Sequence, residues 1–404
     1  MAPNGVSQLL GARPRRSIAN GLCIKGTFVG QGDHGVISNT VQMFNQGKSR
    51  RPTNERKFYM KLRSSRLALV AATALVVAGS LIAVAGAATA TSTSLKKGQI
   101  IYFIPKDTLN PYEVIADHGG KLSLTAIGDK EVVSSGTVDT AAAQIPSIQA
   151  AIAAKAAAIV IAGNDPAALC PSLAKAQAAG VKVVSFDSDV TCPNHLFINQ
   201  ANTQQIGTSE VDLLAKEIGS SGQIAILSAA ATATNQNAWI GYMKQELKKY
   251  PKMKLVSTVY GNDDPATSLT VLQGLLSAYP NLRGIISPTT VGISSAAQYL
   301  DTHKSLLKHL TLTGLGLPSQ MRKYVLDGTC KEFELWNPQN LGYLAGYAAA
   351  SLASGLITGK AGQTFKAGKL GTYKILPRAG KTGPSIVLGP PTVFNKANIN
   401  QFNF

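Results

Sequence analysis

The stretch VKVVSFDSD, residues 181–189, is an apolar run that ends at two carboxylates, Asp187 and Asp189. A run of apolar and β-branched residues of this length predicts a buried strand. In a parallel α/β sheet such strands are buried on both faces, and ligands bind beyond their carboxyl ends. The two aspartates therefore either face a ligand crevice or only cap the turn that follows the strand.

Similar apolar runs alternate with helical segments along the rest of the chain, in two series of about equal length. Strands are predicted before residue 201 at 99–105, 131–133, 157–162 and 195–200, and after it at 223–228, 254–260, 282–287, 310–315 and 331–335. Helices are predicted to begin near Pro111 and at 140–155, 165–180, 235–249, 264–279, 293–303 and 341–356, and short strands at 373–376 and 386–393. This alternation predicts an α/β fold with two lobes, each a parallel sheet flanked by helices, and a ligand cleft between them.

A secretory signal peptide is predicted at residues 60–90. A short basic stretch, MKLRSSR, precedes twenty residues without a charge, and small residues at 85–87 or 88–90 form a cleavage site. The alternative is an uncleaved membrane anchor, since the apolar run is nearly long enough to span a bilayer. Because a signal peptide has to be N-terminal, residues 1–59 are interpreted as a mis-called start or a disordered extension. The mature protein is therefore expected in the periplasm or outside the cell.

The formal net charge of +18 raises the question of a nucleic-acid partner. Residues 1–90, however, hold 12 Lys or Arg residues and only 2 Asp or Glu residues, so less than half of the excess lies in the rest of the chain. There the basic residues are scattered and do not cluster with aromatic ones. The charge predicts a solvated basic surface and no nucleic-acid binding.

Export places the cysteines in an oxidising compartment. Cys170 lies in a predicted helix and Cys192 follows the Asp187 strand, so the two are predicted to form a disulfide near one sheet edge, with Cys330 free. Sequence alone does not settle the connectivity. The five histidines show neither metal-ligand nor triad spacing, and no metal or cofactor is expected.

Four stretches of the sequence carry a resemblance to a known family. They are 228–239 (SAAATATNQNAW), 286–293 (ISPTTVGI), 333–336 (FELW) and 388–394 (LGPPTVF). Over 98–404 the chain resembles the type I periplasmic sugar-binding proteins of ABC importers, in particular the rhamnose-binding subfamily, with autoinducer-2-binding proteins as near relatives. The resemblance implies two lobes joined by three crossovers. It places 98–200 with 336–362 in an N-terminal lobe and 201–335 with 363–404 in a C-terminal lobe.

The resemblance also implies site residues. In the autoinducer-2 relatives the contacts are a Lys after the first strand, the first Asp of a D-S-D, an Asp-Gln pair and a Pro-x-Ala. The matching residues here are Lys106, Asp187, Gln236 and Pro288. Asn235 replaces the Asp of the pair and Thr290 replaces the Ala, which argues against autoinducer-2. Asn337 is a further departure, because the family usually has Asp after the Trp.

A neutral sugar needs fixed carboxylates and amides for its hydroxyls and an aromatic platform for its C–H face. The predicted ligand-binding residues are Lys106, Tyr112, Asp187, Asn235, Gln236, Pro288, Thr290, Trp336 and Asn337. Asp187 is expected to accept hydrogen bonds from the sugar, the lysine and the amides to donate them, and Tyr112 and Trp336 to stack on the sugar.

Several of these residues also have a purely structural interpretation. Lys106 could be a solvated lysine after a strand, and Asn235 could be only a helix N-cap. Trp239, one turn into a predicted helix, is interpreted as core, and Asp165 as a cap. Asp189 is the weaker of the two aspartates, because positions i and i+2 share a face only while a strand continues.

The sequence thus predicts a monomeric binding protein that delivers a monosaccharide, L-rhamnose, to an ABC permease. Autoinducer-2 and ribose-like pentoses remain alternative ligands. A sugar-sensing regulator would need an N-terminal helix-turn-helix, whose periodicity residues 1–59 lack. An enzyme would need a nucleophile–base pair, a metal cluster or a phosphate loop, and none is visible, so no catalytic residue is predicted.

Overall fold

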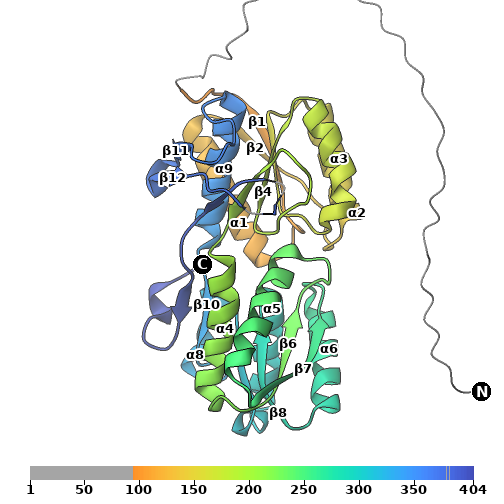
Figure 1. Cartoon of the computed structure of the whole chain (residues 1–404), viewed down its shortest axis with the longest axis vertical. Coiled ribbons are helices and arrows are strands. Elements are labelled where there is room, and N and C mark those ends of the chain that lie inside the picture. Colours follow the sequence, from red (N-terminus) through yellow and green to blue (C-terminus); the bar gives the residue numbers. More distant parts are fainter. Residues whose placement is uncertain (1–93, 379, 382) are drawn as a thin grey trace, which may run out of the picture. The chain divides into compact units, whose positions relative to one another are not determined.

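The computed structural model describes residues 94–378, 380–381 and 383–404, which belong to one compact unit, Ala83–Phe404 (Figure 1). The predicted signal peptide at 60–90 and the extension 1–59 lie outside the described residues. Over the ranges that are described, no helix is both long enough and apolar enough to cross a membrane.

The first large sheet has six parallel strands in the order β13-β5-β4-β3-β1-β2. Their bounds are Ile100–Ile104 (β1), Lys130–Val133 (β2), Ala158–Ile161 (β3), Lys182–Phe186 (β4), Leu196–Asn199 (β5) and Ser385–Val387 (β13). Every residue of β3 and β5 is buried, as is every residue of β4 after Lys182. The apolar run at 181–186 therefore forms a strand in the middle of a parallel sheet, which agrees with the sequence prediction.

Four helices cover this sheet: α1 (Pro111–Ile127), α2 (Ala141–Ala153), α3 (Pro166–Ala178) and α9 (Pro338–Ser354). Helices α2 and α3 pack together on one side and α1 and α9 on the other (Figure 1). Asp165 caps α3, as predicted, by accepting from two backbone N–H groups. The backbones of α1 and α9 approach so closely that a Cβ on Gly342 would lie 1.7 Å from the Ala116 carbonyl oxygen, so only glycine fits there.

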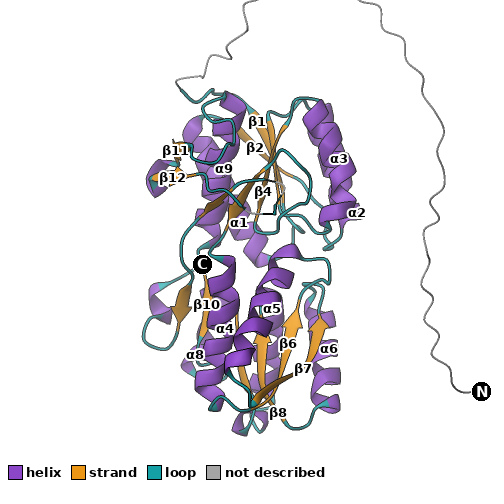
Figure 2. Cartoon of the chain, in the orientation of Figure 1, coloured by secondary structure: helices purple, strands orange, loops and turns teal. Residues whose placement is uncertain are grey.

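The second large sheet has four parallel strands in the order β7-β6-β8-β9. Its strands are Gly222–Ser228 (β6), Met253–Tyr260 (β7), Leu282–Ser287 (β8) and Thr311–Gly314 (β9). The helices around it are Thr203–Ile218 (α4), Thr234–Glu246 (α5), Pro265–Ala278 (α6), Thr290–Thr302 (α7) and Pro318–Leu326 (α8). Figure 2 shows these strands between α4 and α6. Helices α4 and α8 are absent from the sequence prediction.

The chain crosses between the two lobes after β5, after β10 (Phe333–Leu335) and between β13 and β14 (Thr392–Phe394). Strand β14 pairs antiparallel with β10, whereas β13 pairs with β5 of the first sheet. A separate two-stranded sheet joins β11 (Thr364–Lys366) to β12 (Thr372–Lys374).

The third crossover corrects two sequence predictions. Residues 363–404 do not all belong to the C-terminal lobe, because β13 is the edge strand of the first sheet. The predicted single strand at 386–393 is also wrong, since it divides into β13 and β14 at Pro390 and Pro391. Proline has no N–H to donate to a ladder, so the strand stops there and the chain changes lobe.

Cys170 of α3 and Cys192, the pair predicted from the sequence, are joined by a disulfide with a Cα–Cα distance of 5.2 Å. The bond ties α3 to the loop that follows β4. Cys330 is a free, buried thiol, and burial raises its pKa.

A buried carboxyl pair lies where α4 meets the second crossover. Glu210 of α4 and Glu334 of β10 are both 0% exposed. The Ser209 hydroxyl lies 2.7 and 2.8 Å from the two Glu334 oxygens, whereas neither oxygen of Glu210 has a partner within the described part of the chain. Burial raises the pKa of Glu334 to about 8, and burial and then Glu334 raise the pKa of Glu210.

These raised pKa values make stability depend on pH in a definite direction. Both groups keep a proton longer in the folded state, so their favourable contribution is complete below the unfolded pKa of about 4.3. That contribution is lost as pH rises through the folded pKa of Glu334, about 8. We expect the free energy of unfolding to fall between pH 5 and pH 8 by an amount on the order of a few kcal/mol. In Glu210→Gln we expect the free energy of unfolding, measured with urea, to fall less over this pH range. An identical fall in the variant and in the original protein would contradict this account.

Candidate ligand-binding cleft

A cavity lies at the carboxyl ends of β1, β4 and β8, where parallel α/β sheets bind ligands. Its volume is about 320 Å³, which includes space at its mouth that is open to solvent. Eight of the nine predicted site residues line it: Lys106, Tyr112, Asp187, Asn235, Gln236, Pro288, Thr290 and Trp336. They come from both lobes.

Asp187 lines this cavity just after β4, where the backbone turns sharply. Its φ of +54° is in the left-handed region, which Asp tolerates better than most residues. The residue is 3% exposed, and its Oδ1 accepts hydrogen bonds from the Tyr112 hydroxyl at 3.0 Å and from Gln200 Nε2 at 3.2 Å. Its Oδ2 accepts from Asn235 Nδ2 at 3.1 Å, so the carboxylate is held by groups of both lobes.

Lys106 follows β1 and is 4% exposed, so it is not a solvated lysine. Its Nζ lies 3.4 Å from Asp187 Oδ2 and 4.0 Å from Asp263 Oδ2. Burial lowers the pKa of Lys106, but the nearby carboxylates, Asp187 first, outweigh burial and raise it above its ordinary value. The lysine is therefore a cation among carboxylates.

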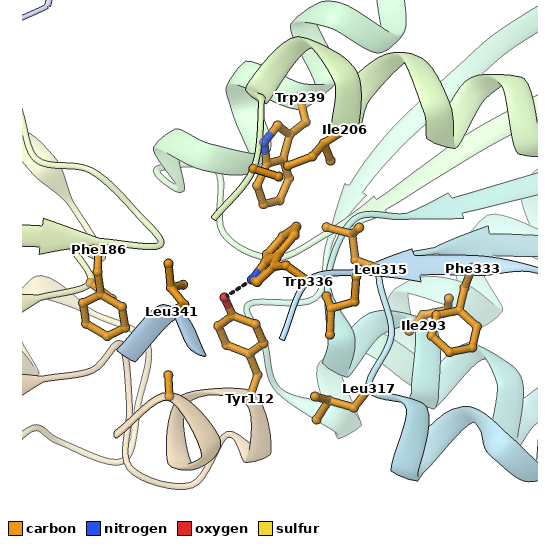
Figure 3. Packing of buried hydrophobic residues seen from close by; sticks show 14 of the residues in the cluster. Tyr112, Phe186, Ile206, Trp239, Ile293, Leu315, Leu317, Phe333, Trp336 and Leu341 are labelled. Carbon is orange, nitrogen blue, oxygen red and sulfur yellow. Dashed lines mark hydrogen bonds between the residues drawn. The ribbon is translucent and has the colours of Figure 1, made fainter. Parts of the chain in front are cut away.

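Aromatic side chains form one wall of the cavity. Trp336 Nε1 donates a 2.7 Å hydrogen bond to the Tyr112 hydroxyl, and the two rings meet edge to face with centroids 6.2 Å apart (Figure 3). Trp239 packs against Trp336 with centroids 5.8 Å apart. Trp239 is buried, as predicted for a core residue, but it also lines the cavity, so the core extends into the site.

The start of α5 supplies the amides from the second lobe. Helix α5 is preceded by Ala233 in the N-cap position, so Asn235 is not the N-cap. Asn235 accepts from the backbone N–H of Gln236 and donates to Asp187. The side-chain oxygen Oε1 of Gln236 accepts from Ser228 Oγ at 2.6 Å and from the backbone N–H of Ala229 at 2.7 Å, which leaves the side-chain amide nitrogen for the cavity.

Two residues that the sequence offered as possible ligand contacts, Asn337 and Asp189, have structural roles. Asn337 does not line the cavity; it is the N-cap of α9 and accepts from the backbone N–H of Asn340 at 3.1 Å. Asp189 accepts from Ser185, His195 and Arg378 at 2.6–2.8 Å. Burial raises the pKa of Asp189, but these partners, His195 first, bring it below the ordinary value. We therefore leave both residues out of the proposed ligand contacts.

Sequence reasoning missed two acidic residues of the cavity, Glu113 and Asp263. Glu113 is in the first turn of α1, where an acidic residue normally serves only to stabilise the helix through its interaction with the helix dipole. Asp263 precedes Asp264, which is the N-cap of α6. Asp263 has a left-handed φ of +50° and lines the cavity instead of capping the helix. It accepts a hydrogen bond from Thr289. The paired aspartates before Pro265 were the only local signal for this residue.

The charges of the cavity indicate the ligand's chemistry. Lys106 is the one cation among the lining residues, and Glu113, Asp187 and Asp263 are all acidic. A ligand with a phosphate or a carboxylate group would meet these acidic side chains and no free positive charge. Within the described ranges no group of three or more His, Cys, Asp or Glu residues could hold a metal ion. The arrangement of acceptors, donors and aromatic faces suits a neutral, hydroxylated molecule.

Two lobes with a ligand cleft between them are the architecture of the solute-binding proteins. The family model described as periplasmic binding protein domain matches residues 101–357, more than half of the chain, and the chain belongs to that family. Proteins of this class bind solutes and are not enzymes, in agreement with the prediction that the protein is not an enzyme.

Two solved structures and one curated protein show the likeness in more detail. An ABC transporter solute-binding protein from Clostridium phytofermentas with bound L-rhamnose is 40% identical, with a TM-score of 0.73 over 76% of this chain and 98% of that one. LsrB from Clostridium saccharobutylicum in complex with AI-2 is 26% identical, with a TM-score of 0.71 over 76% of this chain and 100% of that one. The D-apiose import binding protein of Actinobacillus succinogenes is 27% identical over 44% of this chain, and the match spans only 57% of that protein.

Proposed function

We propose that the protein is the extracytoplasmic solute-binding protein of an ABC importer, and that it binds a monosaccharide, L-rhamnose, in the interlobe cleft. The observation that carries the proposal is the buried Lys106–Asp187–Asn235 cluster beside Tyr112 and Trp336. It combines polar groups for hydroxyls with aromatic faces for the C–H and methyl side of a deoxyhexose. The 40% identical protein with bound L-rhamnose supports this choice of sugar.

In this proposal each lobe contributes part of the recognition. Asp187 accepts from sugar hydroxyls, and Lys106 and Gln236 donate to sugar oxygens. A wrong epimer leaves one of these buried groups unpaired, at a cost of about 1–3 kcal/mol per group. Because the ligand contacts both lobes, it favours the closed arrangement of the hinge.

Two hydrogen bonds beside the cleft join the lobes and stabilise their closed arrangement. Thr234 Oγ1 donates to the Asp189 carbonyl oxygen at 3.0 Å, and Thr232 Oγ1 donates to the Asn164 carbonyl oxygen at 2.9 Å. They connect the start of α5 to the ends of β3 and β4. We propose that an ABC permease binds this closed form of a monomer and receives the sugar from it.

Other ligands and a second role are alternatives within the same fold. AI-2 is the ligand of the 26% identical relative, but Asn235 and Thr290 depart from the pattern of AI-2 contacts. A pentose fits the polar groups and lacks the methyl group that the aromatic wall would cover. A sugar-sensing receptor would use the same cleft and differ in its partner.

A panel of ligands tests the proposal by thermal unfolding of the protein. At a ligand concentration 100 times the Kd, binding adds about 2.7 kcal/mol to the free energy of unfolding. We expect L-rhamnose to raise Tm, and L-fucose, D-ribose and AI-2 to raise it less or not at all. A sugar phosphate serves as the charged control. If D-ribose or AI-2 raises Tm and L-rhamnose does not, L-rhamnose is not the ligand.

A further inference from the structure

Glu113 is a buried acidic group that no part of the proposed recognition uses. It follows Tyr112 in the first turn of α1, is 1% exposed and lines the cavity. Its Oε2 has no hydrogen-bond partner among the residues that the structure describes. A buried oxygen without a partner costs about 1–3 kcal/mol. Asp187 differs, because both of its oxygens accept hydrogen bonds.

The surroundings of Glu113 favour its neutral form. The charged groups that act on it are Asp187 after β4, Lys106 and Asp107 after β1, and Asp117 on its own helix. Burial and then Asp187 raise the pKa of Glu113 well above its ordinary value, and the opposing effect of Lys106 is smaller. A neutral carboxyl group has one O–H donor and a carbonyl acceptor, so it can pair with a hydroxyl in either direction.

We propose that Glu113 contacts the ligand and makes the cleft specific for a neutral molecule with a hydroxyl group at the α1 side of the cavity. The proposal rests on the proposed sugar-binding function and adds a contact to it. A ligand hydroxyl in the cavity gives the Glu113 carboxyl group a hydrogen-bond partner. A ligand with hydrogen or a methyl group at that position leaves the carboxyl group unpaired and is rejected.

Asp117 provides a comparison on the same helix. It lies one turn after Glu113, is 7% exposed, and its Oδ1 also has no partner within the described ranges. Burial and then Asp107 raise the pKa of Asp117 to about 8. Asp117 does not line the cavity. It therefore shares the burial of Glu113 but not its access to a ligand, which makes it a matched control.

The test measures both Tm without ligand and the Kd for L-rhamnose, in the full chain and in three variants. Glu113→Leu removes the unpaired carboxyl group with little change in volume, so we expect a higher Tm but binding weakened about tenfold or more. Glu113→Gln keeps a donor and an acceptor, and we expect a Kd within about threefold of the original. Asp117→Asn should bind as the original protein does.

The outcomes separate this proposal from the one on which it rests. If Glu113→Leu binds L-rhamnose as tightly as the original protein, Glu113 is not a ligand contact. If Glu113→Gln loses as much affinity as Glu113→Leu, a charged carboxylate is required and the proposed neutral pairing is wrong. If the original protein binds none of the sugars in the panel, the proposed function fails first.

Discussion

Asp187→Ala is expected to abolish binding of L-rhamnose, with an affinity loss of more than about 100-fold. The substitution removes the carboxylate that is expected to accept from the sugar. It also removes the shared partner of Lys106, Tyr112 and Asn235, all of which contact Asp187. Hydrogen bonds to a charged group contribute about 1.5–3 kcal/mol each, and the sugar is expected to make two of them with Asp187. Isothermal titration calorimetry measures the change.

Asp189 is the matched control for this experiment, since it lies two residues away in the same turn. Its partners Ser185, His195 and Arg378 are structural and it does not line the cavity. Asp189→Ala should lower Tm while the protein that remains folded binds with unchanged Kd. If Asp187→Ala binds normally, or if both variants lose binding equally, Asp187 is not a specific ligand contact.

Lys106→Met is expected to lower the free energy of unfolding by about 3–5 kcal/mol at neutral pH. Methionine replaces the stem of the lysine but leaves the carboxylates of Asp187 and Asp263 buried without their cation. Lys106 lowers the pKa of Asp263 against the effect of burial, so without Lys106 the Asp263 carboxyl group binds a proton more readily in the folded state. The deficit should therefore be largest at high pH and shrink as pH falls towards 5.

Urea unfolding of the original protein and of Lys106→Met at pH 5 and pH 7 tests this expectation. Asp263→Asn added to Lys106→Met should recover part of the loss, because it removes one of the two unpaired charges. A loss below about 1 kcal/mol, of the size measured for exposed ion pairs, would show that Lys106 is solvated in the folded protein.

The fold was predictable where the chain is strongly patterned. The strands β4, β6 and β8 are apolar runs buried in parallel sheets, and the ends of β4 and β8 carry Asp187 and Pro288 to the cleft. Helix α4 was not predicted, although Ile206, Val211, Leu214 and Ile218 lie on its buried face. These apolar positions recur at close to helical spacing with polar residues between them, which is the pattern of an amphipathic helix, so α4 was predictable from the sequence. The division of 386–393 between the lobes depends on tertiary pairing that the apolar run alone does not show.

The site was predictable where a residue follows a strand within a recognisable motif, as Lys106 and Asp187 do. Glu113 and Asp263 were missed because their local sequence is that of an ordinary helix start and an ordinary turn. Only the fold shows that their side chains line the same cavity. Asn337 was predicted as a ligand contact for the opposite reason, since its position after Trp336 also makes it the N-cap of α9.

The most direct test of the central claim, a cleft for a neutral monosaccharide, is calorimetric titration of the protein with L-rhamnose. We predict saturable binding with one sugar per chain, which Asp187→Ala abolishes and Asp189→Ala does not. Absence of heat with L-rhamnose, together with saturable binding of a sugar phosphate or another anion, would contradict the account. Such a result would mean that Lys106 is free to neutralise a ligand's charge and is not held by Asp187 and Asp263.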